Sequence, residues 1–359
     1  MTPSRPSWAG PRRGGWQAEL AARAREGLPA PMGAYPEAGA REGITRDEAT
    51  EAWRAVRLWP RVLGGHGEPD LTTQVLGAAL STPVGVAPTS MQRVVHPDGE
   101  LAMAAGAAAA GALHVVSTNA GHPFAAIGDA ARAVDPDAVW WGQAYLPPDR
   151  EGAAPVLRAA ADAGARAVAL TVDTPFPGTK YEPADDAWVG HDLSWHRTNF
   201  ADPTAERHHR GLRAHDLAWI TETCGLPTVV KGVLRADDAR RCADAGAAGV
   251  WVSNHGGRQL DRTVSTAAAL PRVVEAVGDD VEVYVDGGVR SGLDALTALA
   301  LGARAVLVGR PTVHALAVDG APGVRALLDL LGLELVEALE LAGCRRLEDA
   351  RTVGAPPDL

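Results

Sequence analysis

The chain has 359 residues, of which 46% are hydrophobic and 22% are charged, and it contains 40 glycines and 26 prolines. This composition is typical of a globular protein with many turns, either as two ordinary domains or as one large α/β barrel. The formal net charge of -10 argues against sequence-independent nucleic-acid binding, which depends on neutralising phosphates with Lys and Arg.

The N-terminal segment and the cysteines bear on the compartment. Residues 1–16 are rich in Pro, Gly and Arg and are expected to be disordered, and no apolar run follows their arginines as it would in a secretory signal. The most apolar stretch, residues 101–116, is interrupted by glycines and is too short to cross a bilayer. Three cysteines in no metal-ligand spacing favour a reducing compartment. We therefore expect a cytoplasmic protein without a metal site or membrane attachment.

Residues 45–59 are predicted to form a helix, and eight strand-like segments follow it. The strands are rich in Val, Ile and aromatic residues and alternate with Ala- and Leu-rich helical segments, as in repeated βα units. The predicted strands are 83–87, 113–117, 138–143, 167–172, 227–231, 249–253, 281–286 and 305–309. Asp98 is expected to cap a helix that begins at Gly99, and the Asp-Ala-Gly segments 162–164 and 244–246 are expected to end two others.

Eight such units favour a closed (β/α)8 barrel, also called a TIM barrel, over an open sheet. We expect residues 17–359 to form one domain, with an N-terminal helical extension before the first strand. The connection 174–213 after the fourth strand is long for a compact domain, so we interpret it as a lid-like loop over the active site.

Polar residues or glycines follow every predicted strand, where the active site of such a barrel lies. One buried Gln or Thr is often only a satisfied core group, but eight strand ends share the pattern. The residues that follow the eight strands are Ala87, Pro88, Thr89, Ser90, Ser117, Thr118, Gln143, Tyr145, Thr171, Asp173, Lys231, Ser253, Asn254, His255, Gly256, Gly257, Arg258, Asp286, Gly287, Gly288, Val289, Arg290, Gly309 and Arg310.

The last two strand ends have the composition of a phosphate site. Gly287 and Gly288 allow backbone amides to approach a ligand, Arg290 begins a helix, and Gly309 with Arg310 repeats the arrangement one unit later. The alternative, that these glycines only terminate strands, leaves both arginines at the barrel mouth unexplained.

Three segments together resemble a known family. Residues 253–261 (SNHGGRQLD), 286–290 (DGGVR) and 170–175 (LTVDTP) are similar to those of the FMN-dependent 2-hydroxy-acid oxidases and dehydrogenases, and the similarity runs from about Leu28 to about Cys344. The resemblance implies FMN as cofactor, a small-molecule substrate and a homotetramer. It implies oxidation of the CH–OH group of a 2-hydroxy acid to the 2-oxo product, with oxygen favoured over another acceptor.

The same resemblance assigns roles to individual residues. His255 is the implied catalytic base, with Asp286 as its partner, and Tyr145 hydrogen-bonds the reacting oxygen. Arg258 holds the substrate carboxylate, and Tyr35 closes the site unless it is a packing residue. The residues assigned to FMN are Ala87, Pro88, Thr89, Ser90, Ser117, Gln143, Thr171, Lys231, Ser253, Asp286, Gly287, Gly288, Arg290, Gly309 and Arg310.

Two positions depart from the family pattern. Where the family continues from Thr-Val-Asp-Thr-Pro to Gly-Arg-Arg, this chain has Gly178-Thr179-Lys180. We expect Thr179 to replace a substrate-binding arginine, with Lys180 compensating only as a point charge. Ser90 stands where Ala or Gly is common, which leaves oxidase or dehydrogenase open. A flavin-dependent oxidation or rearrangement of a non-standard substrate is the alternative function, and a non-catalytic phosphate-binding barrel is a third.

Overall fold

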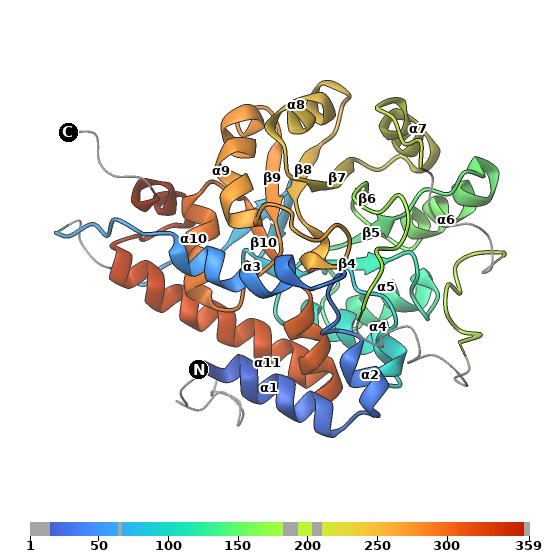
Figure 1. Ribbon diagram of the computed structural model, residues 1–359, viewed down its shortest axis with the longest axis horizontal. Helices are drawn as coiled ribbons and strands as arrows, with labels where there is room; N and C mark the ends of the chain where they lie inside the picture. The colour runs from blue at the N-terminus through green and yellow to red at the C-terminus, as the bar shows by residue number, and fades with distance from the viewer. Residues whose placement is uncertain (1–14, 64–66, 182–192, 203–209, 355–359) are drawn as a thin grey trace.

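Eight parallel strands form a closed barrel surrounded by helices (Figure 1). The computed structural model describes residues 15–63, 67–181, 193–202 and 210–354. Around the barrel the strands are β3 (Val84–Val86), β4 (His114–Ser117), β5 (Trp140–Ala144), β6 (Val168–Thr171), β7 (Thr228–Val233), β8 (Gly249–Val252), β9 (Glu282–Val285) and β10 (Ala305–Val308). Strand β10 pairs in parallel with β3 and closes the ring. The predicted (β/α)8 barrel is confirmed, with strand limits shifted by one or two residues.

One helix follows each strand of the barrel. These helices are α4 (Gly99–Ala109), α5 (Phe124–Arg132), α6 (Arg150–Asp162), α7 (His215–Cys224), α8 (Ala236–Asp244), α9 (Thr266–Val277), α10 (Gly292–Ala300) and α11 (Arg310–Ala342). Helices α6 and α8 end at the two predicted Asp-Ala-Gly segments. Asp98 precedes α4 as predicted, but its side chain makes no capping hydrogen bond. Side-chain caps occur instead at Asp149, Ser265 and Ser291.

An N-terminal helical extension precedes the barrel. Helix α1 (Gly15–Glu26) lies along α11 in Figure 1, and the indole nitrogen of Trp16 donates to a Glu334 carboxylate oxygen at 2.8 Å. The expected disorder of residues 1–16 therefore does not extend to the last two of them, and residues 1–14 lie outside the described ranges. Helices α2 (Ala30–Ala34) and α3 (Ile44–Ala55) follow, and α3 is shorter than predicted because Val56 is extended.

The barrel interior is filled by apolar side chains from alternate residues of the strands. The inward-facing cluster contains Ala87, Leu113, Val115, Val139, Trp141, Ala167, Ala169, Val229, Trp251, Tyr284, Ala305 and Leu307. It also contains Val75 and Leu80 from a hairpin that was not predicted, formed by β1 (Thr73–Val75) and β2 (Ala78–Leu80). This hairpin therefore packs against the interior at the amino ends of the strands.

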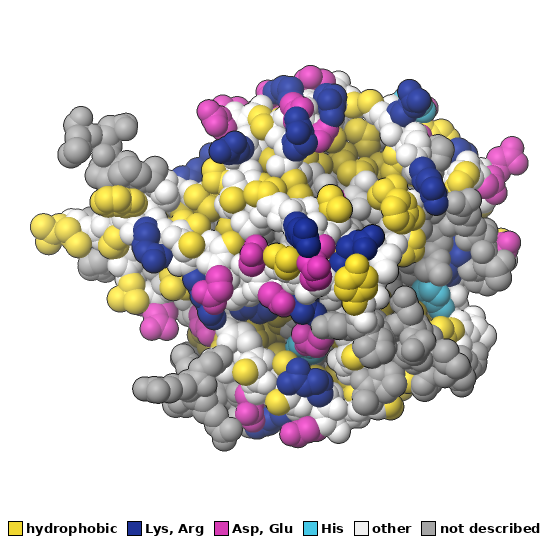
Figure 2. Space-filling model, in the orientation of Figure 1, with side chains coloured by type: hydrophobic (Ala, Val, Ile, Leu, Met, Phe, Trp, Pro, Cys, Tyr) yellow, Lys and Arg dark blue, Asp and Glu magenta, His cyan; other side chains and the backbone are white. Residues whose placement is uncertain are grey.

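The outer surface mixes charges of both signs. On the face in Figure 2, Lys and Arg side chains alternate with Asp and Glu and do not merge into one basic patch. Within the described ranges, no helix combines the length and the apolar character needed to span a membrane. Cys344 is buried, Cys224 and Cys242 are partly buried, and all three are free thiols.

Candidate active site

The cavity at the carboxyl ends of the strands begins where the apolar interior stops. Two residues beyond the inward apolar positions, seven of the eight strands place a residue of a different kind on the same side, because side chains alternate along a strand. These residues are Ser117, Gln143, Thr171, Lys231, Ser253, Asp286 and Gly309. Above them lies a cavity of about 460 Å³.

Most of the predicted site residues line this cavity. Those that do are Tyr35, Ala87, Pro88, Thr89, Ser90, Ser117, Gln143, Tyr145, Thr171, Lys180, Lys231, His255, Arg258, Asp286, Gly287, Gly288, Arg290, Gly309 and Arg310. They come from the N-terminal segment and from all eight strand ends, so only the closed barrel brings them together.

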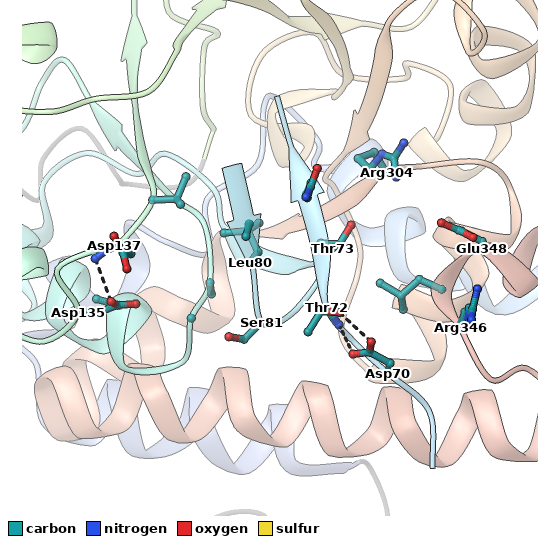
Figure 3. Close-up of a pocket in the computed structure, with 18 residues that line it drawn as sticks. Asp70, Thr72, Thr73, Leu80, Ser81, Asp135, Asp137, Arg304, Arg346 and Glu348 are labelled. Carbon is teal, nitrogen blue, oxygen red and sulfur yellow. Dashed lines mark hydrogen bonds between the residues drawn. The ribbon is translucent and has the colours of Figure 1, made fainter. Parts of the chain in front are cut away.

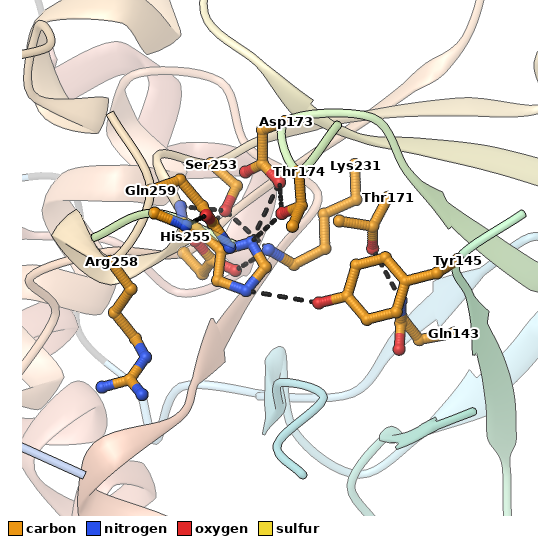
Figure 4. A network of polar contacts seen from close by, with 12 residues as sticks. Gln143, Tyr145, Thr171, Asp173, Thr174, Lys231, Ser253, His255, Arg258 and Gln259 are labelled. Carbon is orange, nitrogen blue, oxygen red and sulfur yellow. Dashed lines mark hydrogen bonds and ion pairs between the residues drawn. The ribbon is translucent and has the colours of Figure 1, made fainter. Parts of the chain in front are cut away.

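His255 is held at both ring nitrogens. Its Nδ1 lies 2.9 Å from Asp173 Oδ1 and 3.3 Å from the Thr174 hydroxyl, and its Nε2 lies 3.4 Å from the Tyr145 hydroxyl (Figure 4). His255 has a left-handed φ of 56° and is followed by two glycines with positive φ. This turn after β8 points the ring at the end of β6, where Asp173 lies. Its Nε2 is therefore on the cavity side.

The predicted partnership between Asp286 and His255 is wrong. Asp286 Oδ2 pairs with Lys231 Nζ at 2.9 Å, and its Oδ1 accepts a hydrogen bond from the Ser253 hydroxyl at 2.6 Å. The aspartate that contacts His255 is Asp173, a polar residue after the fourth strand for which the sequence predicted no partnership with His255. Sequence order favours Asp286 as the partner because it follows β9, the strand next to β8. The turn at His255 instead directs its ring across the barrel mouth toward Asp173.

Asp173 is an ionised partner. Burial acts to raise its pKa, but the charge and hydrogen bond of His255, followed by the charge of Lys231, hold the pKa below its usual range. Its Oδ2 is buried without a hydrogen-bond partner in the described structure. The carboxylate charge therefore acts mainly through His255.

Ser253 was predicted to contact the cofactor, but it lies beneath the cavity and not in its lining. It is fully buried and does not line the cavity. Its hydroxyl accepts hydrogen bonds from Lys231 Nζ at 2.6 Å and from the His255 backbone N at 3.1 Å while donating to Asp286. Ser253 thus joins the buried Lys231–Asp286 pair to the turn that carries His255, beneath the cavity.

The other end of the cavity concentrates positive charge. Arg310 donates from Nε to the Pro36 carbonyl at 2.7 Å and from Nη2 to the Gly256 carbonyl at 2.7 Å. Burial, together with the charges of Arg290 and Arg258, lowers the pKa of Arg310 to about 9. Burial also lowers the pKa of Arg290. Such a buried cluster of like charges is suited to binding an anion, which relieves the repulsion.

Glycine is required at the turn after β9. Gly288 has a φ of +87°, and a Cβ there would lie 2.4 Å from the Ala49 carbonyl oxygen of α3. A side chain would therefore push α3 away from the barrel mouth. From the sequence, Gly288 was predicted to let the backbone approach a ligand. Its packing against α3 is an additional reason for a glycine here.

Aromatic and charged side chains face His255 across the cavity. The Arg258 guanidinium lies over the Tyr35 ring at 4.9 Å and donates to the Tyr35 and Ala38 carbonyls at 2.9 and 2.8 Å. Burial, followed by the charge of Asp173, raises the pKa of the Tyr145 phenol. Tyr145 is therefore a neutral hydrogen-bonding group here.

After β6 the chain has Thr179 and Lys180 where the family has two arginines. Only Lys180 of these two lines the cavity. The Thr179 side chain is exposed and does not line the cavity, whereas Lys180 does. The Lys180 Nζ donates to the Gly178 carbonyl at 2.7 Å. The emphasis that we placed on Thr179 is corrected accordingly.

Several lining residues were not predicted. They include Met91, Asn119, Thr174, Pro177, Leu193 and His196. Leu193 and His196 belong to the long connection expected to be a lid, of which residues 182–192 and 203–209 lie outside the described ranges. From the sequence, His191, His196, His208 and His209 are predicted to be solvated loop residues rather than metal ligands. His196 instead lines the cavity, and the other three lie outside the described ranges. Asn119 could have been predicted from the sequence, because it follows Ser117 by two positions and side chains alternate along a strand.

A second cavity, of about 610 Å³, lies at the amino ends of the strands (Figure 3). Thr73 and Leu80 of the hairpin line it together with Arg304 and Arg346. It contains none of the predicted site residues, and most of its polar side chains are exposed. The chemistry is therefore concentrated at the carboxyl ends.

Comparison with known proteins identifies the family. The model of the FMN-dependent dehydrogenase family matches residues 24–353. The chain belongs to this family. It is 38% identical over 341 residues to glycolate oxidase 3 of Arabidopsis thaliana, covering 91% of each chain. It is 37% identical to the L-lactate oxidase of a Nostoc strain over 89% of this chain and 91% of that protein.

Solved structures agree with this placement. A mandelate oxidase with (S)-2-phenylpropionate superposes with a TM-score of 0.86 at 36% identity, covering 94% of this chain and 97% of that one. The FMN cofactor predicted from the sequence is thereby confirmed, and the cavity fits it chemically. The guanidinium groups of Arg290 and Arg310 are partly buried and are suited to binding a phosphate. Lys231 is a buried cation in the cavity lining, and the Gln143 amide donates to the Thr171 hydroxyl at 3.0 Å.

Proposed function

We propose that the protein oxidises the CH–OH group of a 2-hydroxy acid to the 2-oxo acid and passes the electrons to oxygen. The observation that carries this proposal is the arrangement of His255, with Asp173 on one ring nitrogen and the cavity on the other side of the ring. A base supported by a buried carboxylate, facing a phenol and an arginine, suits proton removal from a small anionic alcohol.

The proton is handled by His255. With Nδ1 protonated and donating to Asp173, Nε2 is an acceptor for the substrate hydroxyl proton. The lowered pKa of Asp173 keeps that carboxylate ionised, which stabilises the imidazolium formed when Nε2 takes the proton. The Tyr145 hydroxyl, 3.4 Å from Nε2, is placed to hydrogen-bond the same substrate oxygen.

The substrate carboxylate would lie against Arg258. Its planar guanidinium is restrained by the Tyr35 ring and by backbone carbonyls of the N-terminal segment, so little side-chain freedom is lost on binding. Lys180 lines the same cavity and adds a second positive charge. Arg258 thus supplies directional recognition and Lys180 an undirected attraction.

The remaining charged residues are suited to the cofactor. FMN, when bound, supplies a two-electron acceptor for the carbon that bears the hydroxyl. Lys231 would hold its position through Asp286 and Ser253 and counter negative charge at the ring end of the cavity. Arg290 and Arg310 would hold the phosphate, with Gly309 leaving room for it.

Three broader proposals accompany this function. Residues 174–213 act as a lid, which is supported by the presence of Pro177, Lys180, Leu193 and His196 along the cavity wall. The protein forms a homotetramer, as its resemblance to the family implies. It works in the cytoplasm, which the three free thiols favour.

The test is an anaerobic titration of the purified yellow protein with a panel of small and aromatic 2-hydroxy acids. Bleaching of the flavin band, its recovery in air, and peroxide in amounts that match the 2-oxo acid are expected. His255→Asn should keep the flavin spectrum and lose bleaching by about a thousandfold in rate. A flavin that no 2-hydroxy acid reduces would overturn the proposal and favour a non-standard substrate.

A further inference from the structure

The proposed function gives no role to the side chain of Asn119. Asn119 is 6% exposed and lines the cavity. Its backbone N donates to the Ser117 hydroxyl at 3.1 Å, but its side-chain amide makes no hydrogen bond to any residue in the described parts of the chain. A buried amide facing a cavity in this way is satisfied only by water or by a ligand.

Asn119 lies beside the reaction centre. Strands β4 and β5 pair Ser117 with Gln143, and Asn119 and Tyr145 each follow two residues later. The Tyr145 backbone N lies 3.4 Å from the Thr118 hydroxyl, which ties the two strand ends together. Asn119 is therefore the neighbour of Tyr145 on the side away from β6 and β8, whose loops carry Lys180 and Arg258.

The wall around Asn119 is otherwise largely apolar. Met91 and Val95 line the cavity after β3. The segment 193–202 lies against the loop that follows β4, because Thr198 N donates to the Ala120 carbonyl at 3.3 Å and a Cβ at Gly121 would lie 2.6 Å from the Trp195 ring. This contact brings Leu193 and His196, which also line the cavity, to the same flank.

We propose that Asn119 is a specificity-determining residue that selects 2-hydroxy acids whose side chain carries a neutral hydrogen-bonding group, such as a carboxamide or a hydroxyl. This inference rests on the proposed function. With the carboxylate at Arg258 and the hydroxyl between His255 and Tyr145, the side chain of the substrate points toward β3 and β4. Among the described residues, none makes a hydrogen bond to the Asn119 side-chain amide at that end.

The discrimination follows from the cost of an unpaired amide. An aliphatic side chain displaces the water on Asn119 and returns no hydrogen bond, whereas a carboxamide replaces that water with donor and acceptor. Sites built to hydrogen-bond a substrate group reject analogues that lack the group far more strongly than apolar pockets reject extra atoms.

The experiment uses the FMN-loaded protein and two substrates of matched shape. Malamate ends in a carboxamide, and 2-hydroxy-4-methylpentanoate ends in an isopropyl group of similar size. We expect the rate constant of anaerobic flavin reduction, divided by the dissociation constant, to favour malamate by about tenfold or more. Asn119→Leu should reverse that preference. Gln74→Leu, which also replaces a side-chain amide by Leu but on an exposed residue at the amino ends of the strands, should leave it unchanged.

A second measurement works without turnover. Succinamate and 4-methylpentanoate are the same two molecules without the reacting hydroxyl, and each is titrated against the flavin absorbance. Tighter binding of succinamate to the wild type, lost in Asn119→Leu, supports the proposal. Equal or tighter binding of 4-methylpentanoate to the wild type, or a preference that Asn119→Leu does not alter, overturns it. Flavin that no 2-hydroxy acid reduces would instead refute the proposed function, and this titration would still decide the role of Asn119.

Discussion

Two layers of side chains inside the same barrel have opposite characters. The lower layer contains large apolar and aromatic groups, and the layer two residues further along the strands contains the polar groups of the site. The pairs are Trp141 with Gln143, Val229 with Lys231, Trp251 with Ser253, Tyr284 with Asp286, and Leu307 with Gly309. A strand therefore serves packing and chemistry within about 7 Å of its length.

The two layers are stabilised differently. The indole nitrogens of Trp141 and Trp251 have no hydrogen-bond partner among the described residues, so these rings contribute through buried area and close packing. In the upper layer, Lys231, Ser253 and Asp286 pair with one another. We therefore expect substitutions in the lower layer to reduce folding stability and substitutions in the upper layer to reduce catalytic activity.

The largest effect is expected in the lower layer. Trp251→Ala removes a fully buried ring on which Lys231 rests at 5.1 Å, and should lower the free energy of unfolding by about 3–5 kcal/mol, measured by urea denaturation. Trp59→Ala, at a side chain that is 49% exposed, is the control and should change it by less than about 0.5 kcal/mol. Equal losses in both variants would contradict the distinction between packing and surface positions.

The second effect separates the two aspartates. Asp173→Asn removes the anion that stabilises the His255 imidazolium and should lower kcat about 100-fold, or about 2.7 kcal/mol, at unchanged flavin content. Asp286→Asn should instead reduce the flavin retained on purification, because its carboxylate holds Lys231. A larger loss of kcat in Asp286→Asn, at full flavin content, would restore the partnership first expected from the sequence.

The third effect concerns a buried titratable group outside both layers. His114 on β4 is 2% exposed, has no hydrogen-bond partner at either ring nitrogen in the described structure, and burial lowers its pKa to about 3. Between pH 6.5 and 3 the unfolded chain binds a proton at this residue and the folded chain does not, so folding stability falls as the pH falls.

Between pH 7 and pH 5 this residue should cost the folded state about 2 kcal/mol. Urea denaturation at both pH values measures the effect as the change in the difference between wild type and His114→Leu. The carboxylates that titrate in both proteins cancel in this comparison. A difference that does not depend on pH would mean that His114 finds a partner on protonation.

The smallest effect tests the segment after β6. Lys180→Arg restores a planar fork in the cavity and should lower KM for a 2-hydroxy acid by up to about tenfold with kcat little changed. Thr179→Arg, at an exposed position, is the matched control and should leave KM within about twofold, since more distant surface charges are screened. The opposite ranking in steady-state assays would show that residue 179 faces the substrate.

The sequence by itself determined the barrel and the location of the site. Val- and Ile-rich runs, the Asp-Ala-Gly helix ends and the polar residues after each strand are local signals, and a parallel barrel converts them directly into an inside and an open end. Seventeen of the nineteen predicted lining residues follow from these local signals, and the other two, Tyr35 and Lys180, follow from the family resemblance.

Only the tertiary structure decided which side chains meet. The pairing of His255 with Asp173 depends on the left-handed turn at His255, and the burial of Ser253 depends on the hydrogen bonds that three neighbouring strands bring to its hydroxyl. The exposure of Thr179 beside the cavity-lining Lys180 depends on how one extended segment is oriented. Spacing along the chain places a residue at a strand end, but backbone torsion and the curvature of the barrel choose its partner.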